Sequence, residues 1–480
     1  MIKTFPVAAV AIVIVAAACA FSFRPIYEPD LWYHLAHGRE DAAGRLVRAN
    51  VFSFTYPDYR QHYTTWLFDV SVYAAWKIGG LGAIQALQAI ALAAAFALVF
   101  VASRVRACGA AAVAVLLLGM FVIEPRAIPR PHVASFVGMA AIALLISRAV
   151  ATRSARPLVW TIPIVALWSN VHVESVFGVG LVAIFAIGET VRPSSLPRRD
   201  AVRALGIAGG CLLATMANPY GWGLFRYLAE NLAVPRMFDI AELQPPYLPA
   251  YRAFFLYAIV AAALLLSQPK RLALWEAITM GVFAIVGFRY LRLTPLLFLA
   301  TAPVVASRLA AWIARGVDRR AVLVTAALAA VLSSRIPLDA LATELRAGDA
   351  ALEPPQFFSP AAIEFARAQG LKGPLFNSLN LGGYLAWKLY PNARIFQDAR
   401  LHSYPSDHFA RIRRASESQA DWDALTAGVD WAVISRPRVN PLSGSGRFPA
   451  DRWAAVYQDE AVEIVVRRDA YPKVVERYGR

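Results

Sequence analysis

Two carboxylates, Glu28 and Asp30, flank a proline directly after the first apolar run of this 480-residue sequence. The residue before a proline is held extended, and residues two apart in an extended segment point to the same face, so the pair can share a proton or a cation. Such a pair serves as a general base or as a ligand for a divalent metal such as Mg²⁺ or Mn²⁺. A structural role stays open, because carboxylates also cap helix N-termini and a helical pattern begins at Leu31.

Two histidines, His34 and His37, follow the carboxylates at a spacing of three residues, which places them on one face of a helix. Imidazoles beside carboxylates either bind a metal or substrate, or make structural hydrogen bonds. We expect both histidines to contact substrate. Apart from a divalent metal, the sequence predicts no cofactor.

The elements that must position these residues are membrane helices. Hydrophobic residues make up 58% of the chain and its mean hydropathy is +0.48, which is too apolar for a soluble enzyme. Eleven apolar runs long enough, or nearly long enough, to span a bilayer cover residues 5–23, 83–102, 108–123, 132–147, 157–169, 173–190, 204–217, 253–267, 272–288, 291–307 and 321–334. We therefore predict a polytopic α-helical membrane protein with about eleven spans. The first run is also compatible with a signal peptide.

The formal charge of the chain is +16, and the positions of its basic residues predict how the chain is oriented in the membrane. Basic residues gather in alternate short loops, near residues 104–106, 148–156, 192–203, 270–271 and 308–320. The positive-inside rule makes these loops cytoplasmic, which puts the N-terminus inside and everything after about residue 335 outside. The same distribution explains the basic charge without a nucleic-acid partner.

In this topology a group of polar residues falls at helix ends on the outer face: Arg126, His172, Glu174, Arg289 and Arg292. Ionisable groups at membrane depth mark candidate sites, and we expect these to bind substrate. Two guanidinium groups at a turn suit a phosphate or pyrophosphate, which they bind through paired hydrogen bonds. Helix-end caps, interhelical pairs and interfacial snorkelling are the structural alternatives.

The composition changes near residue 340, where apolar runs shorten to four or five residues between charged helical stretches. We predict a transmembrane domain over residues 1–335, with a large first outer loop at 24–63, and a small extracytoplasmic α/β domain over 336–480. The expected strands cover residues 374–377, 394–397, 431–435, 454–458 and 462–467. The last two should form a hairpin that turns at Asp459 and Glu460.

A further polar group in the C-terminal domain consists of Asp398, Arg400, His402, Asp407 and His408. Polar residues of this kind, between predicted strands, are usually solvated, so we expect an exposed loop here. A contact with a sugar or with a second protein is the alternative.

Several of these motifs resemble the GT-C superfamily of integral membrane glycosyltransferases, and in particular a group of bacterial GT-C-like membrane proteins. The resemblance extends over nearly the whole chain. It rests on an acidic motif in a large loop after the first helix, and on the segments 30–39, 52–55, 168–172, 218–221, 244–246, 376–378 and 382–385. Two departures from the group are Tyr33, where a second tryptophan is common, and Glu174, where a small residue is expected.

The resemblance implies an inverting transfer of a sugar from a polyprenyl-phosphate-linked donor to an extracytoplasmic acceptor, which is a glycan, a lipid or a protein. It implies that an acidic residue of the first loop acts as base or metal ligand. Carried onto this chain, that motif matches Glu28 and Asp30, and we assign the base to Asp30. The expected location is a bacterial inner membrane, with lipid as a partner. A lipid-linked glycan transporter or flippase, and a non-catalytic scaffold in envelope polysaccharide assembly, remain alternatives.

Overall fold

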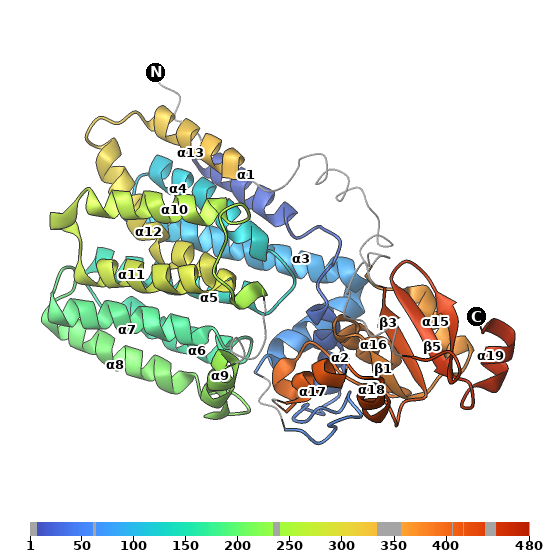
Figure 1. Cartoon of the computed structure of the whole chain (residues 1–480). Coiled ribbons are helices and arrows are strands. Elements are labelled where there is room, and N and C mark those ends of the chain that lie inside the picture. The colour runs from blue at the N-terminus through green and yellow to red at the C-terminus, as the bar shows by residue number, and fades with distance from the viewer. Residues whose placement is uncertain are drawn as a thin grey trace. The chain divides into compact units, whose positions relative to one another are not determined.

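The computed structural model describes residues 7–60, 64–233, 241–333, 357–405, 407–415, 417–436 and 448–479. The chain divides into two compact units (Figure 1). The helical unit contains Met1–Arg24 and Ala83–Leu345, and the mixed unit contains Pro25–Gly82 and Arg346–Arg480. We predicted that the first loop belongs with the membrane helices, but it lies in the same compact unit as the C-terminal residues.

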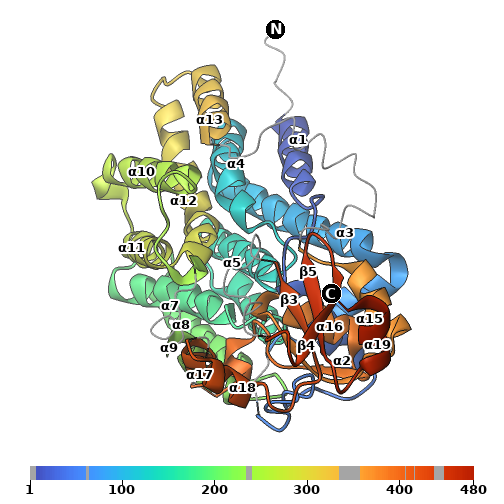
Figure 2. The same cartoon turned by 45° about the vertical axis from the view of Figure 1, so that its right-hand side comes forward.

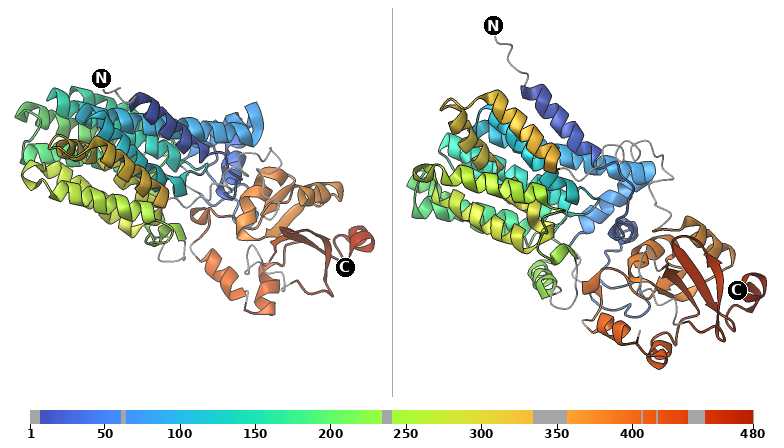
Figure 3. Two further views of the ribbon diagram at one scale, coloured as in Figure 1. Left: turned by 90° about the horizontal axis from the view of Figure 1, so that it is seen from above. Right: turned by 45° about the horizontal axis from the view of Figure 1, so that its top comes forward.

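The helical unit is built from apolar helices that lie side by side in both views of Figure 3. Their bounds are α1 (Val7–Ala20), α3 (Trp66–Arg106), α4 (Gly109–Ile123), α5 (His132–Thr152), α6 (Thr161–Trp168), α7 (Ser175–Val191), α8 (Arg198–Ala214), α9 (Gly223–Ala233), α10 (Arg252–Leu266), α11 (Leu274–Arg289), α12 (Thr294–Ile313) and α13 (Arg319–Ser333). Every one of the eleven apolar runs contains a helix, since a membrane segment must pair all its backbone groups internally.

Five helical segments within the described residues are long and apolar enough to cross a membrane. They are Trp66–Arg106, Gly109–Arg126, His132–Thr152, Leu248–Leu266 and Leu291–Ile313. The composition of the chain and the lengths of these helices are those of a multi-pass membrane protein. The other apolar helices are shorter, so a total of eleven spans remains a prediction.

The boundary between the units falls inside α3, beside two consecutive glycines. Gly79 has φ −160° and ψ 35°, and Gly80 has φ 62° and ψ −149°, so the helix is interrupted there. The positive φ of Gly80 lies in a region that residues with a Cβ atom rarely adopt. The interruption of α3 therefore lies within the mixed unit, close to the division between Gly82 and Ala83.

The mixed unit contains a five-stranded sheet with the order β2-β1-β3-β5-β4. Figure 2 shows three of its strands, β3, β5 and β4. Its strands are β1 (Gly373–Asn377), β2 (Ala393–Ile395), β3 (Trp431–Ser435), β4 (Trp453–Gln458) and β5 (Val462–Arg467). The first three are parallel to one another, and β5 is antiparallel to both β3 and β4. The predicted strands are confirmed to within two residues at each end.

The β4–β5 hairpin turns at Asp459, as predicted, although no glycine marks the turn. The Asp459 carboxylate accepts hydrogen bonds from the backbone N–H groups of Ala461 and Val462, at 2.8 and 2.9 Å. An aspartate that bonds to the backbone two or three residues ahead stabilises a tight turn without the conformational freedom of glycine.

Helices cover the sheet: α15 (Pro360–Ala368), α16 (Gly382–Leu389), α17 (His408–Ala415), α18 (Gln419–Leu425) and α19 (Pro472–Tyr478). Alternate strand residues on one face, among them Phe376 and Ile434, pack with Ala415 of α17 and Trp422 of α18. Only every second residue of a strand contributes to this core, because successive side chains point to opposite faces of the sheet.

The first loop is folded into this sheet. Its helix α2 (Asp30–Ala42) packs on α16, where Trp32 meets the ring of Tyr384 at a centroid distance of 4.9 Å. Beyond α2, Ser53 pairs with Ile395 as a short parallel bridge beside β2. The loop and the C-terminal α/β residues therefore share one core, and neither is a separate domain.

Candidate functional site

Glu28 and Asp30 lie at the N-terminus of α2. Glu28 is buried, with 7% of its surface exposed, and its Oε1 accepts the backbone N–H of Asp30 at 3.1 Å. Glu28 therefore makes the helix-end hydrogen bond that the sequence left open as an alternative. Asp30 is the more exposed of the two, and its carboxylate lies in the first helical turn, where the helix dipole favours a negative charge.

His34 is held by a buried carboxylate that is not among the predicted site residues. Its Nδ1 lies 2.7 Å from Oδ1 of Asp69, in the first turn of α3, and both side chains are almost fully buried. A carboxylate bonded to one ring nitrogen fixes the orientation of an imidazole. The pair joins α2 to the start of α3, while the role of His34 in substrate binding remains a prediction.

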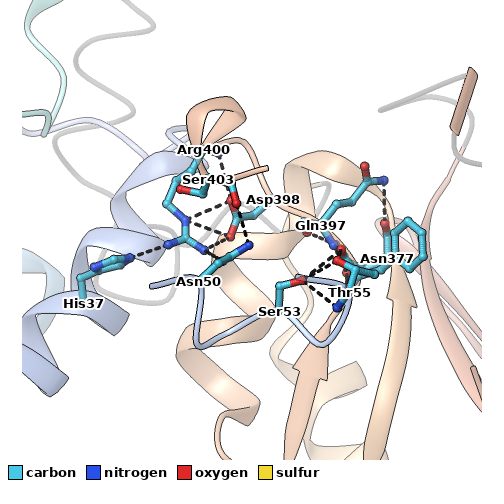
Figure 4. Close-up of polar contacts among 10 residues, drawn as sticks. His37, Asn50, Ser53, Thr55, Asn377, Gln397, Asp398, Arg400 and Ser403 are labelled. Atoms are coloured by element: carbon cyan, nitrogen blue, oxygen red, sulfur yellow. Dashed lines mark hydrogen bonds and ion pairs between the residues drawn. The ribbon is translucent and has the colours of Figure 1, made fainter. Parts of the chain in front are cut away.

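His37 enters a buried network around Arg400 (Figure 4). The Arg400 guanidinium donates from Nε to both carboxylate oxygens of Asp398 at 3.0 Å, from Nη2 to Oδ1 of Asn50 at 2.9 Å, and from Nη1 to Nε2 of His37 at 2.6 Å. Arg400 is 1% exposed. The network joins the first loop to the segment after β2 within the mixed unit.

The prediction of a solvated loop at this place is wrong for Asp398, Arg400 and His408, which are buried, whereas Asp407 is exposed. The first loop supplies the cover, because Asn50 donates to the Ser403 carbonyl and Thr55 to the Phe396 carbonyl, at 3.0 and 2.9 Å (Figure 4). A sequence pattern around residue 400 contains no information about a segment more than 300 residues earlier.

The hydrogen bond from Arg400 decides the protonation of His37. A guanidinium has donors only, so Nε2 of His37 must be the acceptor. Burial, and after it the charge of Arg400, lowers the pKa of His37 well below its ordinary value. His37 is therefore a neutral imidazole, and its proton lies on Nδ1.

A group of donor atoms that can hold a metal ion is formed by His37, Asp41 and Asp69. One ligand atom from each lies within 4.8 Å of the others. One nitrogen and two carboxylates suit zinc or manganese better than magnesium. However, Nε2 of His37 is occupied by Arg400, and Nδ1 of the neutral ring carries the proton. A metal bound by all three residues would have to displace Arg400, so we assign it no step in catalysis.

Asp41 provides a test of this group. Burial raises the pKa of its carboxyl to about 6, well above its value in an unfolded chain. The folded state therefore binds this proton more tightly, which favours folding at low pH, and the advantage is lost as the pH rises from about 4 to 6. We expect Asp41→Asn to raise stability at pH 7.5 by about 1–3 kcal/mol, measured by thermal unfolding of the full chain in detergent. The gain should shrink at pH 4.5.

The asparagine keeps an oxygen for the Val47 N–H, which bonds to Asp41 Oδ1 at 2.9 Å, so the helix end is preserved. A loss of stability at pH 7.5 would contradict this expectation. If Zn²⁺ or Mn²⁺ stabilises the natural protein but not Asp41→Asn, then His37, Asp41 and Asp69 do bind a metal. The hydrogen bond between Arg400 and His37 would then be broken in the metal-bound protein.

In the helical unit, Arg126 and Arg130 converge on one carboxylate, that of Glu242. Arg126 Nη1 lies 2.9 Å from Oε1 of Glu242, and Arg130 Nη1 lies 2.7 and 2.8 Å from the two carboxylate oxygens. Burial opposes ionisation of Glu242, but the charges of Arg130 and Arg126 outweigh it and hold the pKa of Glu242 well below its usual range. The short helix of residues 124–126 and the segment before α5 position the two arginines.

A second polar group in the same unit contains three of the predicted residues. His172 Nδ1 lies 3.4 Å from Glu174, and Arg292 lies 3.8 Å from the other oxygen of Glu174. Ser135 lies 2.8 Å from His172 Nδ1 and accepts the indole N–H of Trp168 at 3.0 Å. These residues come from α5, α6, the α6–α7 turn and the turn before α12.

A tight contact between α5, α6 and α7 supports this group. The indole ring of Trp168 lies against Gly138 and Gly178, where an added Cβ atom would come within 2.5 and 2.6 Å of the ring. Small residues at such positions allow membrane helices to approach closely. The ring is thereby fixed in the orientation that bonds to Ser135.

Arg289 is separate from these groups: it is exposed, and its guanidinium lies 4.8 Å from the ring centroid of Tyr290. This contact fits the interfacial alternative for Arg289. The structure thus brings together Arg292, Glu174 and His172, and it places Arg126 with two residues that sequence reasoning missed, Arg130 and Glu242. The one signal for Arg130 was its position four residues after Arg126.

Comparisons with known proteins identify the fold class. Neither a protein-family model nor a curated protein sequence matches the chain. Solved structures of the oligosaccharyltransferase AglB from Archaeoglobus fulgidus do match. The apo form is 13% identical with a TM-score of 0.62, covering 90% of this chain and 70% of that one. A complex with an inhibitory peptide and a dolichol-phosphate is 12% identical with a TM-score of 0.60, covering 88% and 69%.

A third structure, of the same oligosaccharyltransferase with Zn and sulfate, is 12% identical with a TM-score of 0.53 and covers 95% of this chain and 73% of that one. The GT-C-like fold predicted from the sequence motifs is therefore confirmed. At these identities the likeness establishes the fold.

Proposed function

We propose that this protein is a membrane glycosyltransferase that moves a sugar from a polyprenyl-phosphate-linked donor to an extracytoplasmic acceptor, with inversion at the anomeric carbon. The observation that carries the proposal is a GT-C-like fold over about nine-tenths of the chain. One structural neighbour is described in complex with a dolichol-phosphate and another with an acceptor peptide, which supports a lipid-linked donor and a separate acceptor.

In the proposed reaction, Asp30 removes the proton from an acceptor hydroxyl or amide as its oxygen or nitrogen attacks the anomeric carbon. The bond from that carbon to the phosphate oxygen breaks, and the lipid phosphate leaves as an anion. Asp30 suits the role of base because it is the more exposed carboxylate of the pair. Glu28 acts by holding the first turn of α2, through its hydrogen bond to the Asp30 backbone.

The leaving phosphate requires cationic groups, and guanidinium pairs stabilise such an anion as its charge develops. We assign this role to Arg126 and Arg292, and retain Arg289 as a contact at the membrane interface. His172 and Glu174 position Arg292. A divalent metal, Mg²⁺ or Mn²⁺ held by Glu28 and Asp30, would supply further charge neutralisation for the phosphate when bound.

We place the protein in a bacterial inner membrane with the mixed unit on the extracytoplasmic side. This orientation follows from the positive-inside distribution of the loops. Since α2 and the C-terminal α/β residues share one compact unit, both must lie on the same side. The measurement is labelling of cysteines introduced at the exposed positions 58 and 414 with a reagent that does not cross the membrane. Both should be labelled from the extracytoplasmic side.

The test of the proposed function is an analysis of lipid-linked sugars and finished glycans in cells that lack the protein. We expect a sugar-loaded polyprenyl phosphate to accumulate and one glycan, glycolipid or glycoprotein to lose a sugar, both restored by the natural protein. If the donor accumulates on the cytoplasmic face alone, the protein acts as a flippase and the proposal is wrong. Unchanged lipid-linked sugars and glycans would exclude both activities.

A further inference from the structure

Glu242 occupies a strongly cationic position in the helical unit. Its carboxylate lies between the guanidinium groups of Arg126 and Arg130, and each arginine reaches it at less than 3 Å. Arg292 also acts on the charge of Glu242. Two guanidinium groups thus bond to one carboxylate, while the third, that of Arg292, lies 3.8 Å from Glu174 and adds its positive charge to the region.

The side chain of Arg126 is buried and held in place, but not all of its N–H groups are hydrogen-bonded. It is 5% exposed, and its side chain is fixed by His132, whose Nε2 lies 2.7 Å from the Arg126 carbonyl and whose Nδ1 lies 3.5 Å from its Nη2. The Nε–H of Arg126 is buried and has no hydrogen-bond partner among the residues that the structure describes. A buried guanidinium donor that remains unsatisfied is costly, so the site favours an anion with more acceptor oxygens than a carboxylate has.

We propose that Arg126 and Arg130 form the phosphate site of the anionic lipid donor, and that Glu242 is a resident counter-anion that the phosphate displaces. This inference rests on the proposed function and adds to it Arg130 and Glu242. Without a bound phosphate, the Glu242 carboxylate neutralises the arginines. When the phosphate enters, its additional oxygens accept from both guanidinium groups, including Nε of Arg126, and Glu242 turns to solvent, to which it is already partly exposed.

Displacement has a measurable consequence, because Glu242 competes with the ligand. Removing its charge must tighten binding of any phosphate at these arginines. A purely structural ion pair that fixes residues 241–243 to the helix ends predicts the opposite, since loss of the pair would loosen the arginines and weaken binding. The sign of the change therefore separates the two roles.

The experiment measures binding of three probes to the full chain in detergent: a polyprenyl phosphate, inorganic pyrophosphate and the uncharged polyprenol. We expect Glu242→Gln to bind the polyprenyl phosphate about tenfold more tightly than the natural protein, which corresponds to about 1.4 kcal/mol. Polyprenol binding should not change. Arg130→Gln in the Glu242→Gln background should remove the gain. Pyrophosphate lacks the lipid contacts and should bind more weakly overall, but it should show a similar gain because it displaces the same carboxylate.

The matched control is Glu189→Gln, which removes the charge of a different carboxylate of the same unit, one that is fully buried. Glu189 is bonded to backbone N–H groups of residues 194–196 and to Ser194, and no arginine is among these partners. It should leave phosphate binding unchanged. Equal or weaker binding of polyprenyl phosphate by Glu242→Gln would overturn the inference, and so would a gain limited to pyrophosphate.

These outcomes are independent of the glycan analysis. If cells lacking the protein show normal glycans while Glu242→Gln still binds polyprenyl phosphate more tightly, the proposed function fails and the phosphate site stands. If the glycan defect is found but binding does not change, only the role of Glu242 is wrong.

Discussion

Replacing Asp30 with asparagine should lower sugar transfer by about 10²- to 10⁴-fold, which is the range that a general base contributes. The amide has nearly the size of the carboxylate but cannot accept the acceptor's proton. The fold of α2 should survive, because the hydrogen bond at its N-terminus uses the backbone N–H of Asp30 and the side chain of Glu28. The measurement is complementation of the glycan defect, followed by transfer assays on the purified full chain.

Two companion variants make this prediction specific. Asp58→Asn removes an exposed carboxylate of the same loop and should transfer at the natural rate. Glu28→Gln retains a side-chain oxygen for the Asp30 N–H and should lose less activity than Asp30→Asn. If Asp30→Asn complements fully, Asp30 is not the base, and the carboxylate pair has the helix-capping role alone.

Replacing Arg400 with methionine should destabilise the mixed unit by about 3–5 kcal/mol, the usual cost of removing one partner of a buried ion pair. The substitution leaves Asp398 buried without its cation, and it also removes the hydrogen bonds to Asn50 and His37 that tie the first loop to the C-terminal residues. Thermal unfolding of the full chain should begin at a lower temperature than in the natural protein. The first loop should become sensitive to limited proteolysis.

Arg414→Met is the matched control, since Arg414 is exposed on α17, and its loss should change stability by less than about 0.5 kcal/mol. The double variant Arg400→Met with Asp398→Leu removes both charges and should recover part of the lost stability. Equal stability of Arg400→Met and Arg414→Met would mean that the network does not hold the loop.

Local signals in the sequence predict the start of α2 but not the burial of Arg400. The N-terminal signal at Glu28 and Asp30 correctly located the start of a helix, because a proline followed by an amphipathic pattern is local information. The burial of Arg400 was not predicted, because the residues that enclose it are Asn50 and His37. His37 lies 363 positions before Arg400 in the chain. Charged residues between strands are usually solvated, and nothing nearby in the sequence marks the exception.

The candidate site shows the same division. The charges of Arg126, His172, Glu174 and Arg292 at predicted helix ends make them candidates in the sequence, since such groups are costly in a membrane. Glu242 was not found, because its importance depends on two arginines more than 100 residues earlier. Asp69 was missed because it sits at the start of an apolar helix, where a carboxylate is ordinarily a capping group.

The sequence by itself determined the membrane class, the positions of the apolar helices, the five strands and the GT-C-like motifs. Each follows from hydropathy or alternation over a few to about twenty neighbouring residues. Only the tertiary structure decided that the first loop belongs with the C-terminal α/β residues, that Arg400 is buried, and that Glu242 lies between two arginines. These outcomes depend on which distant side chains exclude water from one another, and that is a property of the folded chain.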